Sequence, residues 1–171
     1  MVKNLPLDPG KVIFTYKGNS LLPEILVDAD ACPVKQEVYR VAKRYGLKVT
    51  LIANSPMNLP QDDGVSLVVV KGQMDAADDW IVGHAARNDI VITGDIPLAA
   101  RCLKIGARVL EPKGYVFTET TISNVLANRD IMTYLRNIGQ DTSGPVPFKK
   151  QDRSRFLQSL DKVIRAIFDE K

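Results

Sequence analysis

The sequence is poor in the residues that build disulfide scaffolds and zinc sites. Its 171 residues include two cysteines, Cys32 and Cys102, and one histidine, His84. The cysteines form no CxxC pair, and neither has a histidine beside it. These absences exclude a disulfide-stabilised fold and a thiolate zinc site, and they are typical of proteins in a reducing cytosol. We therefore expect a cytoplasmic protein.

Long apolar runs and glycine-rich nucleotide motifs are also missing. The opening residues, MVKNLPLDPGK, contain no apolar run of signal-peptide length, and the longest apolar runs elsewhere are the size of strands. A membrane span needs about 20 apolar residues, so we expect no membrane partner. Gly72, Gly94 and Gly106 are isolated and match neither GxGxxG nor the P-loop spacing, which argues against a nucleotide cofactor.

Charge is moderate in amount and uneven along the chain. Hydrophobic residues make up 45% and charged residues 25% of the sequence, which is typical of globular proteins, and the net charge is +3. Residues 1–100 carry 10 Lys and Arg against 12 Asp and Glu, whereas residues 101–171 carry 13 against 8. This asymmetry fits a protein that handles a polyanion through metal, and it fits a chance scatter of surface charge equally well.

The order of apolar runs predicts one α/β domain at residues 24–171, preceded by an N-terminal extension, residues 1–23, with one β-prone run at 12–16. The predicted strands are 25–27, 48–53, 65–70, 89–93 and 108–110, and the predicted helices among them are 34–45, 76–85 and 97–105. Right-handed βαβ crossovers follow from this order, so the sheet should be parallel and covered on both faces.

The C-terminal part of the domain has a different character. Residues 111–150 are rich in loop-forming residues, with one helical stretch near 122–138. Beyond the GPVPFKK segment, apolar residues recur at helical spacing from Phe156 to Phe168. This pattern predicts an amphipathic C-terminal helix that packs on the domain.

Aspartates stand directly after three of the predicted strands. Ligands of open parallel sheets bind beyond the carboxyl ends of the strands. Three junctions place carboxylates at that edge: Asp28 and Asp30 after the first strand, Asp75, Asp78 and Asp79 after the third, and Asp95 after the fourth. Capping or a turn explains each aspartate singly, and it is their shared position that predicts a site.

The chemistry of a carboxylate cluster follows from its charge. Carboxylates at short range repel one another unless cations neutralise them. Hard oxygen ligands select Mg²⁺, Mn²⁺ or Ca²⁺ over zinc, and two such ions can activate water and stabilise the leaving oxygen of a phosphodiester. The pattern therefore predicts a divalent metal site for phosphodiester cleavage.

Other polar candidates have simpler interpretations. His84 is in helical register with Trp80, so we expect a partly buried, hydrogen-bonded side chain rather than a metal ligand. Cys32 is interpreted as a small packing residue, with a lowered thiol pKa at the following helix start as the alternative. Lys71 follows the third strand, where it is either a phosphate contact or an ordinary exposed lysine.

Four segments resemble the YaiI/YqxD family of uncharacterised bacterial proteins: ILVDADACPV (25–34), DAADDWIV (75–82), IVITGDIPLA (90–99) and the GPVPF to DRSRF stretch (144–156). The resemblance runs from about residue 24 to the C-terminus. It implies a branch of the PIN-like superfamily, whose members are metal-dependent nucleases with a three-layer, Rossmann-like fold and central strand order 3-2-1-4-5.

Carried over by position, the resemblance implies that the metal-binding acids are Asp28, Asp75, Asp78 and Asp95. Asp30 belongs to the DAD motif of the family itself. Asp79 stands where related sequences often carry Asn, so it is only an additional candidate ligand. Glu37 is the loose counterpart of the acid that PIN proteins carry on their first helix.

The leading hypothesis is an Mg²⁺- or Mn²⁺-dependent nuclease that acts on RNA in preference to DNA. The catalytic candidates are Asp28, Asp30 and Asp95. The substrate-binding candidates are Lys71 and four basic residues at the start of the last predicted helix: Lys149, Lys150, Arg153 and Arg155. Phosphate contacts at a helix N-terminus would suit these residues, and so would ordinary solvated charge.

Two alternatives remain open. A phosphatase of the haloacid dehalogenase type would use Asp28 as nucleophile and Asp30 as general acid–base, although Cys32 and Ala99 stand where that chemistry expects Thr or Val and an acid. A non-catalytic module would bind RNA or a partner protein through its basic residues. The sequence leaves the oligomeric state open.

Overall fold

The predicted sheet is present and mostly parallel. The computed structural model describes residues 22–139 and 147–170, so the β-prone run at 12–16 lies outside the described residues. Within them one sheet has the order β3-β2-β1-β4-β5-β6. Its strands are β1 (Ile25–Asp28), β2 (Val49–Ala53), β3 (Val65–Val69), β4 (Ile90–Ile92), β5 (Arg108–Leu110) and β6 (Val116–Phe117). Strands β1 to β5 are parallel, as predicted, and their neighbours in the sheet confirm the predicted order 3-2-1-4-5.

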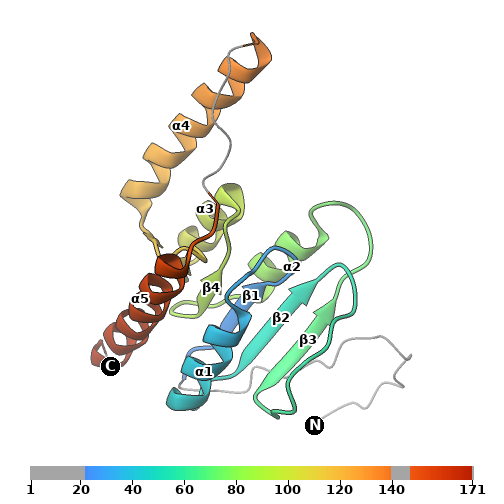
Figure 1. Ribbon diagram of the computed structural model, residues 1–171, viewed down its shortest axis with the longest axis vertical. Helices are drawn as coiled ribbons and strands as arrows, with labels where there is room; N and C mark the ends of the chain where they lie inside the picture. Colours follow the sequence, from blue (N-terminus) through green and yellow to red (C-terminus); the bar gives the residue numbers. More distant parts are fainter. Residues whose placement is uncertain (1–21, 140–146, 171) are drawn as a thin grey trace.

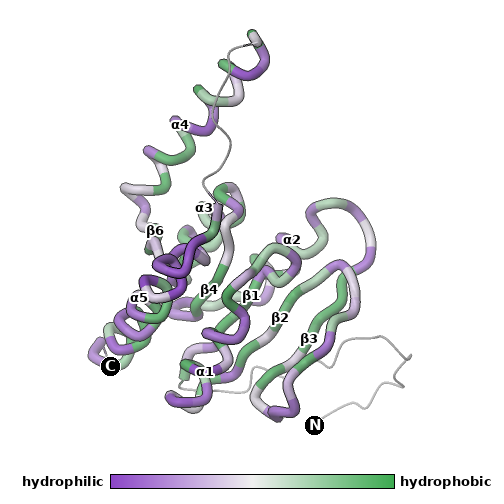
Figure 2. The backbone as a smooth tube through the Cα atoms, in the orientation of Figure 1, coloured by the Kyte–Doolittle hydropathy of each residue, from purple (hydrophilic) through white to green (hydrophobic). Residues whose placement is uncertain are grey.

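Helices cover both faces of the sheet and give the predicted three layers (Figure 1). On one face lie α1 (Lys35–Tyr45) and α5 (Lys150–Asp169), the predicted C-terminal amphipathic helix. The other face is covered by α2 (Ala76–His84), α3 (Ile96–Lys104) and the first turns of α4 (Glu119–Asn137). Apart from Asp28 at the end of β1, the central strands are buried, and they are mostly apolar (green in Figure 2), as expected for a sheet with two covered faces.

Local sequence signals fix several helix ends. Gly46 ends α1 with a φ of 67°, the left-handed conformation that glycine adopts without strain. Helix α4 begins at Glu119, earlier than the predicted residue 122, because the Thr118 hydroxyl accepts a hydrogen bond of 3.2 Å from the Thr121 N–H. None of the helices in the described ranges has the length and apolarity needed to cross a bilayer.

The segment after β5 was predicted to be loop, and it contains a short strand that the sequence did not indicate. Strand β6 pairs antiparallel with β5 through Val109 and Phe117. Two residues are too few to show an alternating pattern, so periodicity could not reveal this strand.

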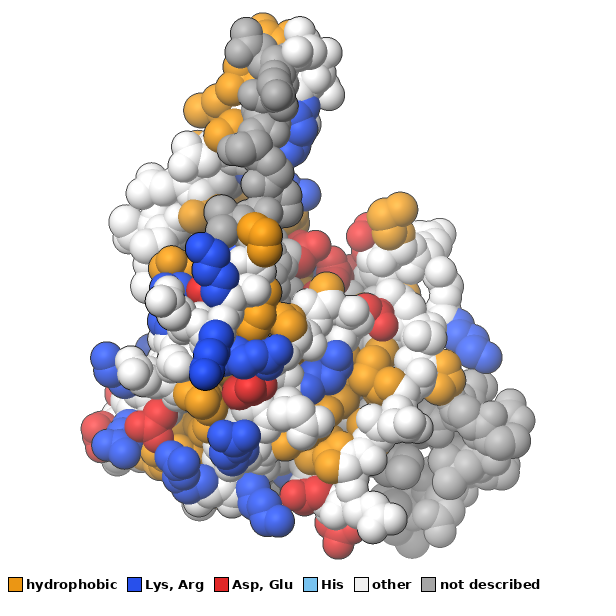
Figure 3. Space-filling model, in the orientation of Figure 1, with side chains coloured by type: hydrophobic (Ala, Val, Ile, Leu, Met, Phe, Trp, Pro, Cys, Tyr) orange, Lys and Arg blue, Asp and Glu red, His pale blue; other side chains and the backbone are white. Residues whose placement is uncertain are grey.

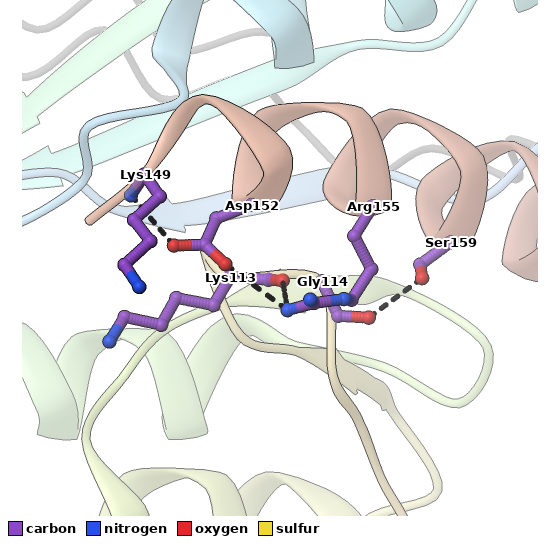
Figure 4. Close-up of polar contacts among 6 residues, drawn as sticks. All are labelled: Lys113, Gly114, Lys149, Asp152, Arg155 and Ser159. Atoms are coloured by element: carbon purple, nitrogen blue, oxygen red, sulfur yellow. Dashed lines mark hydrogen bonds and ion pairs between the residues drawn. The ribbon is translucent and has the colours of Figure 1, made fainter. Parts of the chain in front are cut away.

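The turn between β5 and β6 anchors α5 (Figure 4). The Arg155 guanidinium donates to the carbonyl oxygen of Lys113 at 3.2 Å, and the Ser159 hydroxyl donates to that of Gly114 at 2.7 Å. Gly114 has a φ of 91°, and a Cβ there would lie 2.7 Å from the backbone of Arg155 and Phe156. Only glycine fits this close approach of turn and helix.

Candidate metal centre

The ends of β1 and β4 are joined by one buried hydroxyl. These two strands are parallel neighbours, so their carboxyl ends meet. Thr93, which follows β4 and is 1% exposed, donates its Oγ1 hydrogen to Asp28 Oδ2 at 3.0 Å. The same Oγ1 accepts a hydrogen bond of 3.0 Å from the backbone N–H of Asp95. Thr93 therefore fixes the Asp28 carboxylate and the start of α3 relative to each other.

Asp95 serves as the N-cap of α3. Its Oδ1 accepts a hydrogen bond of 2.9 Å from the Leu98 N–H, while the residue as a whole is exposed. The capping role that the sequence suggested for single aspartates thus applies to Asp95. Capping uses one carboxylate oxygen and holds the side chain at the edge of the sheet.

Helix α2 brings a third junction to the same edge. Asp75 is its N-cap residue and Asp78 lies in its first turn. The pKa of Asp78 is raised to about 6, mainly by burial and then by the charges of Asp95, Asp28 and Asp75, against a smaller lowering by Arg101. Like charges act at this strength only at short range. Asp95, Asp28 and Asp75 are therefore near enough to Asp78 to act on it electrostatically, and we call these four aspartates the acidic edge.

The carboxylate of Asp28 is affected in the same direction. Its pKa is raised above the ordinary aspartate value, mainly by burial and then by the charges of Asp95 and Asp30, while the hydrogen bond from Thr93 lowers it. In Figure 3, acidic side chains (red) lie in a hollow between the base of α4 and the loop that leads into α2. The acidic edge is a surface site at the carboxyl end of the sheet.

Asp30 and Asp79, the other two predicted acids, are held by other partners. Asp30 is exposed, and its Oδ2 accepts a hydrogen bond of 2.8 Å from the Asn54 N–H beyond β2. Asp79 forms an ion pair with Arg101, with 2.9 Å between Oδ1 and Nη2. Asp30 stays beside Asp28, whereas the charge of Asp79 is already compensated.

The donor set of the acidic edge consists of carboxylate oxygens, which suit Mg²⁺ or Mn²⁺. In the described part of the chain, however, no three His, Cys, Asp or Glu side chains stand close enough together to hold one ion. The four aspartates interact electrostatically, but they do not form a metal coordination sphere. Metal binding at the acidic edge stays a prediction.

The α5 basic segment (Lys149, Lys150, Arg153 and Arg155) contains two paired arginines and two exposed lysines. Arg153 Nη1 donates to the carbonyl oxygen of Pro33 at 2.9 Å and to Glu37 Oε1 at 3.2 Å. Arg155 Nη1 donates to Asp152 Oδ1 at 3.1 Å as well as to the turn before β6. Lys149 and Lys150 are exposed at the helix start, and so is Lys71 after β3. The arginines have structural partners that sequence reasoning missed.

Glu37 faces α5. Its ion pair with Arg153 joins α1 to α5, and its second carboxylate oxygen is buried without a hydrogen-bond partner among the described residues. The loose assignment of Glu37 as a counterpart of the first-helix acid therefore gains no support from its contacts.

Cys32 and His84 have the packing roles expected for them, with one difference. Cys32 is 5% exposed, and burial raises the pKa of its thiol, so the alternative of a lowered pKa is wrong. His84 is exposed rather than partly buried. Its ring stacks on Trp80 with centroids 3.8 Å apart, and Nδ1 lies 2.7 Å from the Trp80 carbonyl oxygen.

Thr93 is the residue of this site that the sequence interpretation did not single out. The signal was present in the ThrGlyAsp sequence that ends the fourth strand. A hydroxyl at the last buried position of a strand needs a hydrogen-bond partner, and Asp28 on the neighbouring strand is the nearest acceptor that the topology offers.

Comparison with known proteins gives a family and several relatives. The family described as "Uncharacterized BCR, YaiI/YqxD family" matches residues 26–166. A UPF0178 protein of Azorhizobium caulinodans is 52% identical over 140 residues, covering 82% of this chain and 88% of the relative. One of Rhodospirillum centenum is 53% identical over 148 residues, covering 84% and 96%. One of Brucella ovis is 52% identical over 141 residues, covering 82% and 88%. No solved structure matches the chain significantly.

Proposed function

This chain belongs to the YaiI/YqxD family, and we propose that it is a divalent-metal-dependent nuclease that hydrolyses phosphodiester bonds, in RNA in preference to DNA. One observation supports the proposal above all others. Asp28, Asp78 and Asp95 come from three separate β–α junctions, and the charges of Asp95 and Asp28 add to burial in raising the pKa of Asp78 to about 6. Carboxylates held in mutual repulsion favour a cation among them.

In this proposal Asp28, Asp78 and Asp95 hold Mg²⁺ or Mn²⁺, with Asp75 as a further ligand. Such an ion acidifies water and offsets the negative charge of the phosphodiester. Asp75 is exposed, and Asp95 uses only its Oδ1 to cap α3, so we expect binding of an ion to draw the acidic edge together. Asp79 is the weakest candidate ligand, because Arg101 already neutralises it.

The protein's own groups would orient the reaction and move the proton. Thr93 keeps one oxygen of Asp28 directed by a hydrogen bond of 3.0 Å, which fixes the geometry on the sheet side. Asp30 lies beside Asp28, exposed to solvent and anchored by the Asn54 N–H, where it is available as a general base for water. The nucleophile in this reaction is water rather than a side chain.

Lys71, Lys149 and Lys150 are the better candidates for substrate phosphates. All three are exposed, while Arg153 and Arg155 each form an ion pair within the protein. Arg153 also contacts Pro33 in the loop that follows β1, so the start of α5 lies next to the junction that carries Asp28 and Asp30. Phosphate contacts at that position could guide a strand towards the acidic edge.

The test is cleavage of fluorescently labelled single-stranded RNA and DNA by the full chain with Mg²⁺, Mn²⁺ or EDTA. We expect Mn²⁺-dependent cleavage of RNA, faster than that of DNA, which falls at least about a hundredfold in Asp28→Asn and Asp95→Asn. Asp63→Asn is the matched control, because Asp63 is an exposed aspartate in the loop that precedes β3, at the opposite edge of the sheet.

Three outcomes would overturn the proposal. Hydrolysis of p-nitrophenyl phosphate without cleavage of nucleic acid would favour the phosphatase. Salt-sensitive RNA binding with no metal-dependent cleavage would favour the binding module. Cleavage that survives both aspartate substitutions would place the activity elsewhere or in a contaminant.

A further inference from the structure

The structure places Arg101 beside the acidic edge. Arg101 lies on α3, six residues after the N-cap Asp95, and its Nη2 donates to Asp79 Oδ1 on α2 at 2.9 Å. Its charge also lowers the pKa of Asp78, which precedes Asp79 in the first turn of α2. The guanidinium is therefore within electrostatic range of a proposed metal ligand.

The ion pair between Arg101 and Asp79 contributes little to the fold. The side chain of Arg101 is 43% exposed and that of Asp79 is 68% exposed. Pairs that are open to solvent contribute little net stability, because water screens both charges. Helices α2 and α3 already share an apolar cluster that includes Ile81 and Leu98, so they do not need the ion pair to stay together.

The arginines of the α5 basic segment are held differently. The carboxylates that pair with Arg153 and Arg155 have side chains that are only 11% exposed, and each arginine also donates to a backbone carbonyl oxygen. In the described part of the chain, the Arg101 guanidinium donates to one exposed carboxylate. A phosphate can therefore take Arg101 from Asp79 without leaving a buried carboxylate unpaired, whereas Arg153 and Arg155 cannot leave their partners at so low a cost.

A strand of nucleic acid that approaches the acidic edge brings further negative charge. A metal ion offsets the charge of the phosphodiester that is cleaved, but the phosphates on either side of it need other partners. A guanidinium binds phosphate through two parallel hydrogen bonds and stays charged at any physiological pH. Asp79 would return to water when Arg101 leaves it, which costs little for a side chain that is already exposed.

We propose that Arg101 binds a backbone phosphate next to the scissile phosphodiester, and that Asp79 holds the guanidinium until the substrate replaces it. This inference rests on the proposed function, because it concerns the same site. The substrate and Asp79 compete for one guanidinium, so Arg101 raises the affinity for RNA and Asp79 lowers it. An ion pair that served only the fold would not give the two residues opposite effects on RNA affinity.

The test is the affinity of the full chain for labelled single-stranded RNA, measured by fluorescence anisotropy in EDTA and in Ca²⁺. We expect Arg101→Ala to weaken binding at least about fivefold and to lower the slope of log affinity against log salt by about 0.7, the share of one phosphate contact. Arg101→Lys keeps the charge and should keep the slope. Arg87→Ala is the matched control, because Arg87 is exposed in the loop before β4, at the opposite edge of the sheet.

Asp79→Asn should have the opposite effect. We expect it to tighten RNA binding about two- to fivefold, because the guanidinium no longer has to leave a carboxylate. Asp63→Asn removes the same charge at the opposite edge and measures the gain from net charge alone. In the Arg101→Ala background, the gain from Asp79→Asn should fall to that of Asp63→Asn.

The outcomes separate this inference from the proposed function. Unchanged RNA affinity in Arg101→Ala, or weaker binding in Asp79→Asn, would overturn the role of Arg101 and leave the nuclease to its own cleavage test. A gain from Asp79→Asn that persists in full in the Arg101→Ala background would indicate charge repulsion alone and would also overturn it. If the wild type binds no RNA in either EDTA or Ca²⁺, the proposed function and this inference both fail.

Discussion

The acidic edge and the α5 basic segment use charge in opposite ways. At the acidic edge, Asp28 and Asp78 have raised pKa values because they are partly buried and because other aspartates lie near them. In the α5 basic segment, Arg153 and Arg155 each pair with a carboxylate and donate to a backbone carbonyl. Unpaired like charges cost stability, whereas the arginine contacts connect α5 to α1 and to the turn before β6. The first arrangement is suited to a ligand and the second to the fold.

The largest expected effect tests whether the turn between β5 and β6 holds α5 in place. Gly114→Ala places a Cβ 2.7 Å from the backbone of Arg155 at a φ of 91°. We expect a loss of about 3 kcal/mol or more in the free energy of unfolding, because neither backbone segment can move aside cheaply. Urea denaturation measures it. Gly83→Ala, in α2 with open space around it, should be neutral or stabilising. Equal stability of the two variants would mean that the turn does not hold α5.

The second prediction concerns the acidic edge and metal. If Mn²⁺ binds only the folded protein, it should stabilise the wild type by about 2.7 kcal/mol at a hundred times its dissociation constant. Asp28→Asn should abolish that response and raise the melting temperature without metal, because it relieves repulsion on Asp78 and Asp95. Differential scanning calorimetry measures both. If the melting temperature of the wild type is the same with and without Mn²⁺, the result would contradict a metal site at the acidic edge.

The contrast between the two regions also shows what the sequence could reveal. Aspartates after strands identified the acidic edge, because a parallel sheet sends all its carboxyl ends to one side. Asp152, three residues before Arg155, is a local partner, but nothing local to Arg153 or Arg155 indicated their long-range partners. Arg153 contacts Glu37, 116 residues away, and Arg155 contacts Lys113, 42 residues away. Strand order and helix faces follow from periodicity, whereas contacts of long side chains depend on how two helices settle against each other.

A third, smaller effect separates the two halves of the α5 basic segment. Arg155→Ala leaves the Asp152 carboxylate, which is 8% exposed, without its ion-pair partner. We expect a loss of about 1–2 kcal/mol in stability, since a buried acceptor loses a charged donor. Lys150→Ala, at an exposed position three residues before Arg153, should change stability by less than about 0.5 kcal/mol.

Nucleic-acid binding should show the reverse order. If the exposed lysines contact phosphates, Lys150→Ala weakens RNA affinity and flattens its salt dependence more than Arg155→Ala does. Fluorescence anisotropy at several salt concentrations compares the two variants. A larger loss of affinity in Arg155→Ala, measured where both variants are folded, would mean that Arg155 contacts the substrate more closely than Lys150 does.

The smallest expected effect concerns the pH dependence of the acidic edge. The pKa of Asp78 rises from 3.8 to about 6 in the folded protein, so between these values the native state holds more protons than the unfolded state. The contribution of Asp78 to stability is therefore fully present below about pH 4 and is lost as the pH rises through about 6. Asp78→Asn removes this titration. We expect the melting temperature of the wild type, relative to Asp78→Asn, to fall between pH 4 and pH 6.5 and to be constant above that range.

Asp63→Asn, measured in the same buffers, corrects for the loss of one aspartate away from the acidic edge. Because a cation competes with the proton for the same oxygens, adding Mn²⁺ should reduce the fall and move its midpoint to lower pH. A difference between wild type and Asp78→Asn that does not change with pH would show that Asp78 lies apart from the other aspartates. The acidic edge would then shrink to Asp28 and Asp95, which Thr93 links directly.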